Sequence, residues 1–207
     1  PVLRAALALV LSVVGVTLSH RSAIAVVVNQ HVRGDRQVFF GGFDQAPLVA
    51  FSGLRGVAVW YDVGGGGGGL PYWATTIDGG QSWSSGGHFG TFQSPQGAAA
   101  SVAVDQSGAF YFLTQRIDQG LEVRKGSFAG SALAWQAPRP VQPGLPYGSW
   151  RQHARIACAP ASGAVYVTST VVQYENPKTT IEFSRSLNGG VTWSAPVAIG
   201  SDSSDGA

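Results

Sequence analysis

Short apolar runs recur beyond residue 46, separated by turns rich in Gly, Ser, Asp and Pro. The runs are three to eight residues long, which is the length of a β-strand rather than of a typical helix. They fall into three similar groups of four. We therefore expect strands at 47–51, 57–62, 72–76 and 82–84; at 101–105, 109–115, 121–125 and 133–137; and at 155–159, 164–170, 179–186 and 191–196.

Two landmarks recur with the same period in these groups. Tryptophans lie at positions 83, 135 and 193, which are 52 and 58 residues apart. Segments of one kind, a Gly followed by apolar and aromatic residues, begin at 56, 108 and 163, which are 52 and 55 residues apart. Four antiparallel strands in roughly 50 residues are typical of one blade of a β-propeller. The pattern predicts an all-β fold with blades at about 46–90, 98–140 and 153–199.

The N-terminus has the features of an export signal. Arg4 precedes an apolar run over 5–18, and Ala23, Ile24 and Ala25 have the small-x-small form of a cleavage site. The run is shorter than the roughly 20 residues that a membrane span needs. We therefore expect a signal helix within a removable segment 1–25 and a lead-in over 26–45. The mature protein is expected to be secreted, extracellular or periplasmic, without a membrane span.

A second repeat lies in the corners between the third and fourth strands, at 76–83 and 186–193. In each, a hydroxyl residue closes one strand, Asp78 or Asn188 folds its oxygen onto the backbone, and glycines take positive-φ positions. The pattern S/T-x-D-x-G-x-S/T-W resembles the Asp-box of sialidases and other bacterial-neuraminidase-repeat proteins; Asn188 departs from it. The residues with this structural role are Thr76, Asp78, Gly80, Ser82 and Trp83, and Ser186, Asn188, Gly190, Thr192 and Trp193.

The resemblance implies a six-bladed propeller, of which this chain supplies about three blades. The stretch 201–207 is then a linker at a truncated end. The resemblance also implies an exported protein that recognises a glycan or glycoconjugate and acts, when complete, as an exo-α-sialidase type of glycoside hydrolase. The alternative is a non-catalytic repeat propeller used for binding or as a scaffold.

Sialidase chemistry requires arginines for the substrate carboxylate, an acid as proton donor, and a Tyr activated by a Glu. The loops expected on the ligand-binding face supply Asp62, Asp118 and Glu175 as catalytic candidates, and Arg36, Arg116, Arg151 and Trp150 as substrate-binding candidates. The Phe-Arg-Ile-Pro motif of the family is missing, and Tyr174 beside Glu175 points to the opposite face if extended. Each candidate also has a plain alternative role, as a solvated loop residue or, for Trp150, as filling between blades.

Composition limits the remaining chemistry. Net charge is +2 and only 12% of residues are charged, which argues against a nucleic-acid partner. His153 has no acid or second His at metal-ligand spacing, so we expect no metal and no cofactor. The single cysteine, Cys158, excludes an internal disulfide and lies in an apolar run, which favours a buried structural thiol.

Overall fold

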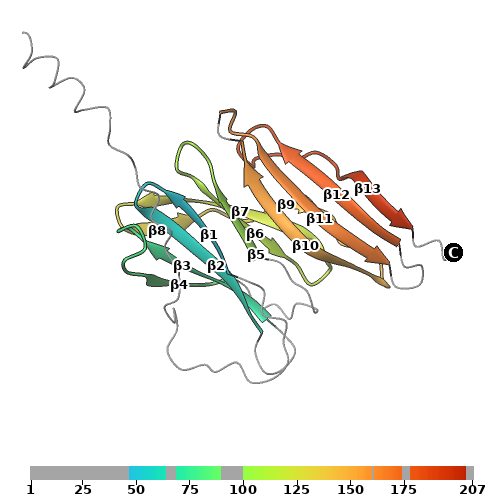
Figure 1. Cartoon of the computed structure of the whole chain (residues 1–207), viewed down its shortest axis with the longest axis horizontal. Helices are drawn as coiled ribbons and strands as arrows, with labels where there is room; N and C mark the ends of the chain where they lie inside the picture. Colours follow the sequence, from blue (N-terminus) through green and yellow to red (C-terminus); the bar gives the residue numbers. More distant parts are fainter. Residues whose placement is uncertain (1–46, 64–68, 90–99, 160, 174–177, 204–207) are drawn as a thin grey trace, which may run out of the picture.

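The computed structural model describes residues 47–63, 69–89, 100–159, 161–173 and 178–203. Within these ranges the chain forms thirteen strands in three antiparallel sheets, and it contains no helix. Figure 1 shows the three sheets side by side, in chain order. The predicted all-β fold is confirmed. The expected signal helix and lead-in lie outside the described residues and stay predictions.

The first sheet contains β1 (Leu48–Ser52), β2 (Arg55–Val63), β3 (Gly69–Thr76) and β4 (Ser84–His88), in that order. All neighbouring pairs are antiparallel. This is the predicted order of four strands, except that β4 begins where the predicted outer strand ends. Residues 77–83, which precede β4, form a corner held by side-chain hydrogen bonds rather than part of the strand.

The second sheet has an outer edge made of two short strands. It contains β5 (Ala100–Val104), β6 (Phe110–Gln115), β7 (Leu121–Ala129), β8 (Ala132–Trp135) and β9 (Arg139–Gln142). Both β8 and β9 pair with β7. We expected one outer strand over 133–137. Pro138 stands between the two pieces, and a proline has no N–H to donate to the ladder.

The third sheet contains β10 (Ser149–Cys158), β11 (Val165–Gln173), β12 (Lys178–Ser186) and β13 (Val197–Ser203). The expected outer strand at 191–196 is displaced to β13, which runs past residue 200. The corner again takes up the intervening residues, and Ser194 N donates to Arg185 O before the strand begins. β10 begins six residues earlier than expected and contains a bulge between Gln152 and Arg155.

The second sheet is buried on both sides, which explains the uninterrupted run Phe-Tyr-Phe-Leu in β6. Phe110 and Phe112 pack in a cluster with Val57 and Val59 of the first sheet. Tyr111 and Leu113 point the other way, into a cluster with residues of the third sheet. Two separate cores therefore join three sheets, as expected for stacked blades.

The tryptophans at the constant interval occupy equivalent backbone positions. The residue after each Trp pairs with a third-strand residue that itself pairs near the start of the second strand: Ser84 with Thr75, and the backbone N–H groups of Gln136 and Ser194 with the carbonyls of Lys125 and Arg185. Their ring contacts differ, because Trp83 packs on Phe51 of its own sheet while Trp135 packs on Trp73 of the neighbouring sheet. The repeat predicted from the sequence is thus present in the backbone.

Candidate functional site

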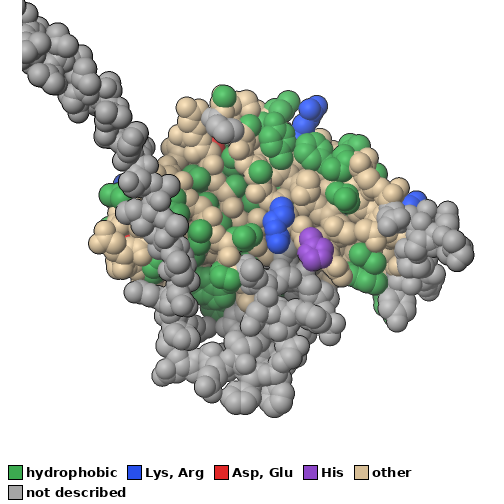
Figure 2. Space-filling view, in the orientation of Figure 1, with side chains coloured by type: hydrophobic (Ala, Val, Ile, Leu, Met, Phe, Trp, Pro, Cys, Tyr) green, Lys and Arg blue, Asp and Glu red, His purple; other side chains and the backbone are tan. Residues whose placement is uncertain are grey.

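The sheets have two ends with different character. One end, here called the corner face, carries the β1–β2 and β5–β6 turns and the corners 76–83 and 186–193. The other, the loop face, carries the β6–β7 turn 116–120 and the segment 143–148 that leads into β10. In Figure 2, one side of the molecule shows hydrophobic side chains scattered among polar ones, with few charged side chains between them. The charged side chains that could bind a ligand are therefore considered one at a time.

The β6–β7 turn presents an ion pair on the loop face. Arg116 Nε donates to Asp118 Oδ1 at 3.0 Å, and a second guanidinium N–H donates to Oδ2. Gly120 N also donates to Asp118 Oδ1, at 3.0 Å. The hydrogen bond from Arg116 is the main reason that the pKa of Asp118 lies below its usual value. A carboxyl group held ionised is a poor proton donor, so in this geometry Asp118 is better suited to accept hydrogen bonds.

The segment before β10 packs on this turn and projects an aromatic ring. Leu145 N donates to Asp118 O at 2.9 Å, and a side chain at Gly144 would collide with Asp118. A tight turn follows, closed by a 3.2 Å bond from Ser149 N to Pro146 O, with Gly148 at φ 84°. Tyr147 is fully exposed at its tip. We call Arg116, Asp118 and Tyr147 the loop-face cluster.

Arg151, expected to bind substrate, lies inside the protein. Its side chain is 0% exposed and forms an ion pair with Glu182, whose Oε2 lies 2.7 Å from the guanidinium. It also donates to the hydroxyl of Ser169 at 2.8 Å and to side-chain or backbone oxygens of the second sheet and the segment after it, namely Gln142 Oε1, Gln119 O and Pro143 O. The structure therefore places Arg151 between the second and third sheets, where it contacts no open surface.

Arg151 also fixes the turn that carries the ion pair. Its Nε donates to Gln119 O at 2.9 Å, and its backbone N donates to Gln119 Oε1 at 3.1 Å. Gln115 Nε2 binds the same Gln119 oxygen and the carbonyl of Arg151. Gln119 is one of two described non-glycine residues with positive φ. These bonds hold Gln119 in that conformation. The buried Arg151 therefore fixes the turn that carries Arg116 and Asp118 of the loop-face cluster.

The other sequence candidates do not join this cluster in the described part of the chain. Trp150 is half-buried in β10 opposite Val172, on the reverse side of the strand from Arg151. Asp62 lies in β2, paired with Leu70, but its side chain is outside the described residues. Arg36 and Glu175 also lie outside them. Their roles as binding and catalytic residues stay predictions.

The two corners have the hydrogen bonds expected from their sequence. Thr76 Oγ1 accepts from Gly80 N at 2.9 Å, and Asp78 accepts from Ser82 N at 3.0 Å; Ser186 and Asn188 repeat both bonds at 2.9 Å. The hydrogen bond from the Ser82 hydroxyl makes the largest contribution to lowering the pKa of Asp78. Asn188 instead donates from Nδ2 to the Thr192 hydroxyl at 2.8 Å. The hydrogen bond between these two side chains thus runs in the opposite direction in the second corner, which allows an amide to replace the carboxylate.

The described residues give no indication of a metal site or a membrane span. No group of three or more His, Cys, Asp or Glu among them is placed to hold a metal ion. No helix suited to crossing a bilayer is found in the described ranges. Cys158 is a free thiol whose pKa is raised to about 12, chiefly by burial and then by the charge of Asp105. It is unsuited to act as a nucleophile.

The partners of Arg151 are not predictable from the sequence. Gln142, Ser169 and Glu182 are the side chains that meet its guanidinium, and they lie 9, 18 and 31 residues away. Each occupies an ordinary strand position with no local motif. The only sequence signal was the apolar period, which places their strands in adjoining blades without predicting which polar residues meet.

Comparison with known proteins supports the fold. No family model matches the chain, and no curated protein matches it in sequence. The GH43 endo-arabinanase from Bacillus licheniformis is structurally similar, with a TM-score of 0.52, 11% identity, and coverage of 76% of this chain and 59% of the enzyme. A protein of unknown function from Dyadobacter fermentans has a TM-score of 0.50, 17% identity and coverage of 78% and 52%. Native arabinanase from Bacillus subtilis has a TM-score of 0.49, 12% identity and coverage of 71% and 52%.

At these identities the similarity concerns architecture alone. The chain has the blade arrangement of a β-propeller, and the fold neighbour named first is a β-propeller glycoside hydrolase. The chain spans less than two thirds of that neighbour's length. The three structures named above give no support specific to sialidases, so the sialidase function stays a prediction from the sequence.

Proposed function

We propose that this chain is part of a β-propeller that binds a glycan at its loop face. The loop-face cluster carries the proposal. An exposed Tyr147 ring offers a flat apolar surface for a sugar ring, and the Arg116–Asp118 pair beside its segment offers donors and acceptors for sugar hydroxyls. The fold neighbour is an enzyme that acts on a glycan, which supports the same ligand class by analogy of fold only.

Hydrolysis by an exo-sialidase type of mechanism is the finer form of this proposal. It requires a proton donor, and Asp118 is held ionised by Arg116. The donor would then come from Asp62, Glu175 or other chain segments. The non-catalytic alternative is favoured by the same observation about Asp118 and by the internal position of Arg151. Export through the N-terminal signal remains part of the proposal in both forms.

The experiment measures binding and hydrolysis separately on the full chain. Binding is measured by calorimetry against linear arabinan, sialyllactose and lactose, and hydrolysis by release of reducing sugar or of a fluorogenic sialoside. We expect Tyr147→Ala to weaken binding roughly tenfold, which is about 1.4 kcal/mol, and Tyr147→Phe to preserve it. Both variants should retain the wild-type melting temperature, because the side chain is fully exposed.

A matched control is Leu187→Ala, which removes an exposed apolar side chain from the corner face. It should leave glycan binding unchanged. Equal loss in Leu187→Ala and Tyr147→Ala, or no binding of any glycan by the wild type, would contradict the proposal. Binding without hydrolysis would support the non-catalytic form.

A further inference from the structure

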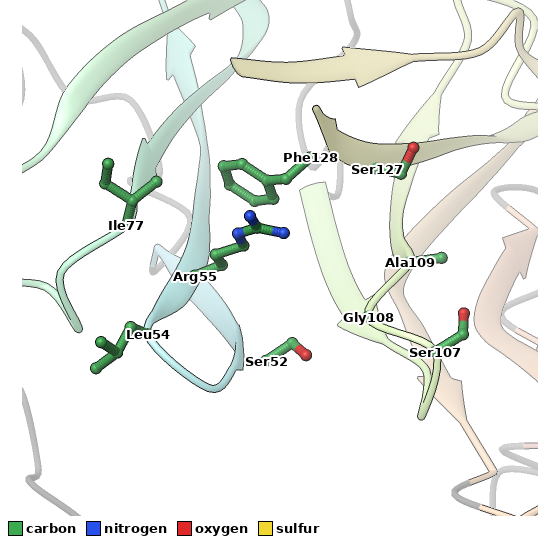
Figure 3. A pocket seen from close by; sticks show the side chains of 9 residues that line it. All are labelled: Ser52, Leu54, Arg55, Ile77, Ser107, Gly108, Ala109, Ser127 and Phe128. Carbon is green, nitrogen blue, oxygen red and sulfur yellow. The ribbon is translucent and has the colours of Figure 1, made fainter. Parts of the chain in front are cut away.

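A groove of about 600 Å³ lies on the corner face between the first and second sheets. Figure 3 shows its walls. On one side are the β1–β2 turn and Ile77 of the first corner; on the other are the β5–β6 turn and the end of β7. It lies at the opposite end of the sheets from the loop-face cluster. Its volume is within the range of small-ligand sites.

Arg55 supplies the charge of this groove. In Figure 3 its guanidinium points into the groove, beside the ring of Phe128. The guanidinium carbon lies 5.5 Å from the centre of that ring, which holds the cation by a cation–π contact across the sheet boundary. Among the described residues the Arg55 side chain has no hydrogen bond or ion pair, and Arg55 is the one charged residue in the lining of the groove. Its planar array of donors is therefore free for a ligand.

The walls of the groove are fixed before any ligand binds. Gly79 N donates to Leu54 O at 2.9 Å, which ties the β1–β2 turn to the first corner. On the other wall, Asp105 accepts from Ser107 N at 2.9 Å and from Ala109 N at 3.0 Å. A Cβ at Gly108 would lie 3.2 Å from Ser52 Oγ, so the two turns approach closely. A preformed groove loses little conformational entropy on binding.

The remaining lining combines hydroxyls with an apolar rim. Ser52 and Ser127 make no side-chain hydrogen bond within the described part of the chain, whereas Ser107 donates to Asp105 and keeps its lone pairs. Leu54 and Ile77 form the rim and are 66% and 49% exposed. A ligand that fits has an anionic group for Arg55, hydroxyls for the serines and an apolar face for the rim.

We propose that this groove binds a carboxylate-bearing sugar unit of an acidic glycan. A carboxylate matches the fork of an arginine with two parallel N–H···O bonds, and a pyranose ring has both the hydroxyl edge and the apolar face that the walls require. That the anion is a sugar rests on the proposed function. That the ligand is an anion rests on Arg55 alone. The site is separate from the loop face and would bind a second segment of a polysaccharide.

The test uses calorimetry on the full chain with trigalacturonate, the neutral maltotriose and inorganic phosphate. We expect trigalacturonate to bind at least roughly tenfold more tightly than maltotriose. Arg55→Gln should remove this preference, and Arg55→Lys should restore part of it, since lysine keeps the charge without the fork. Arg185→Gln, which removes an exposed arginine of β12, should bind as the wild type does.

Three outcomes would overturn the proposal. The first is equal binding of trigalacturonate and maltotriose, and the second is unchanged trigalacturonate binding in Arg55→Gln. The third is competition by phosphate that is as strong as competition by the uronate, which would indicate a simple anion site. Tyr147→Ala separates this proposal from the proposed function, because it should weaken binding at the loop face and leave uronate binding at the groove intact. Loss of uronate binding in Tyr147→Ala but not in Arg55→Gln would place that ligand on the loop face and contradict the groove.

Discussion

At the residue scale, Arg151 shows how a charged side chain can serve the fold rather than a ligand. A buried guanidinium is costly unless its donors and charge are matched. Here Glu182 supplies the charge, while Gln142, Ser169 and backbone carbonyls accept the N–H groups. The consequence is that one side chain links the second sheet, the third sheet and the turn beneath the loop-face cluster.

We predict that Arg151→Met lowers the free energy of unfolding by about 3 kcal/mol, because it leaves the partly buried Glu182 without its counter-ion and removes the guanidinium donors from Gln142 and Ser169. Urea denaturation monitored by tryptophan fluorescence measures this. Arg155→Met is the control, since Arg155 is exposed and its guanidinium donates, among the described residues, only to the neighbouring Ala154 carbonyl. It should change stability by no more than about 0.5 kcal/mol. Equal effects of the two substitutions would mean that the Arg151 network is not important for stability.

At the scale of single elements, the β5–β6 hairpin depends on one carboxylate. Asp105 accepts from the backbone and hydroxyl of Ser107, from Ala109 N, and from the Tyr111 hydroxyl at 2.8 Å. Partial burial raises the pKa of Asp105, but these hydrogen bonds together outweigh it and leave the pKa below its usual value. Burial and the same carboxylate raise the pKa of Tyr111, so the phenol stays a donor at every ordinary pH.

A pKa that is lower in the folded than in the unfolded state means that the ionised form stabilises the fold. This contribution is complete above the unfolded pKa of about 4 and is lost as pH falls through the folded value. We predict that Asp105→Asn is less stable than the wild type at pH 7 and that the difference shrinks below about pH 4. Thermal unfolding between pH 7 and pH 2 measures it. A difference that stays constant over this range would contradict a role for the charge.

Sequence predicts those elements whose causes are local. The corners were predictable because each of their hydrogen bonds, from a glycine N–H to the hydroxyl and from Ser82 or Thr192 N–H to Asp78 or Asn188, joins residues four positions apart. β6 was predictable from its apolar run. The start of β13 was not, because the corner bonds of Asn188 and the Ser194–Arg185 contact delay the outer strand.

The candidate site was predicted less well than the fold. Arg116 and Asp118 were found as loop residues, but their mutual pairing was not. Arg151 was assigned to the ligand because its partners lie in three other strands and only the folded structure brings them together. The groove at Arg55 was missed for the same reason, since Phe128 belongs to the next sheet. Polar contacts across blades carry no periodic signal in a sequence.

At the scale of the whole molecule, both terminal sheets have one side that faces no other described sheet. Trp60 and Tyr72 stack at 5.9 Å on that side of the first sheet, and Tyr166 and Phe183 stack at 5.9 Å on that of the third. In a propeller such sides are covered by neighbouring blades. Val197 lies opposite Phe183 and is 56% exposed, and Ile181 is 42% exposed.

We predict that the 207-residue chain self-associates through the third sheet, since exposed aromatic and aliphatic side chains of this kind favour contact between copies. Sedimentation velocity should show a species larger than the monomer at about 100 μM, within the concentration range where exposed sheet surfaces associate. Ile181→Lys combined with Val197→Lys should shift the protein toward the monomer, because two charges would have to be desolvated in the contact. Leu187→Lys changes a residue of the corner face that is 67% exposed, more than either of these two, and should not shift the protein toward the monomer. A monomeric wild type at that concentration, or dissociation by Leu187→Lys as well, would show that the open side of the third sheet is not the contact surface.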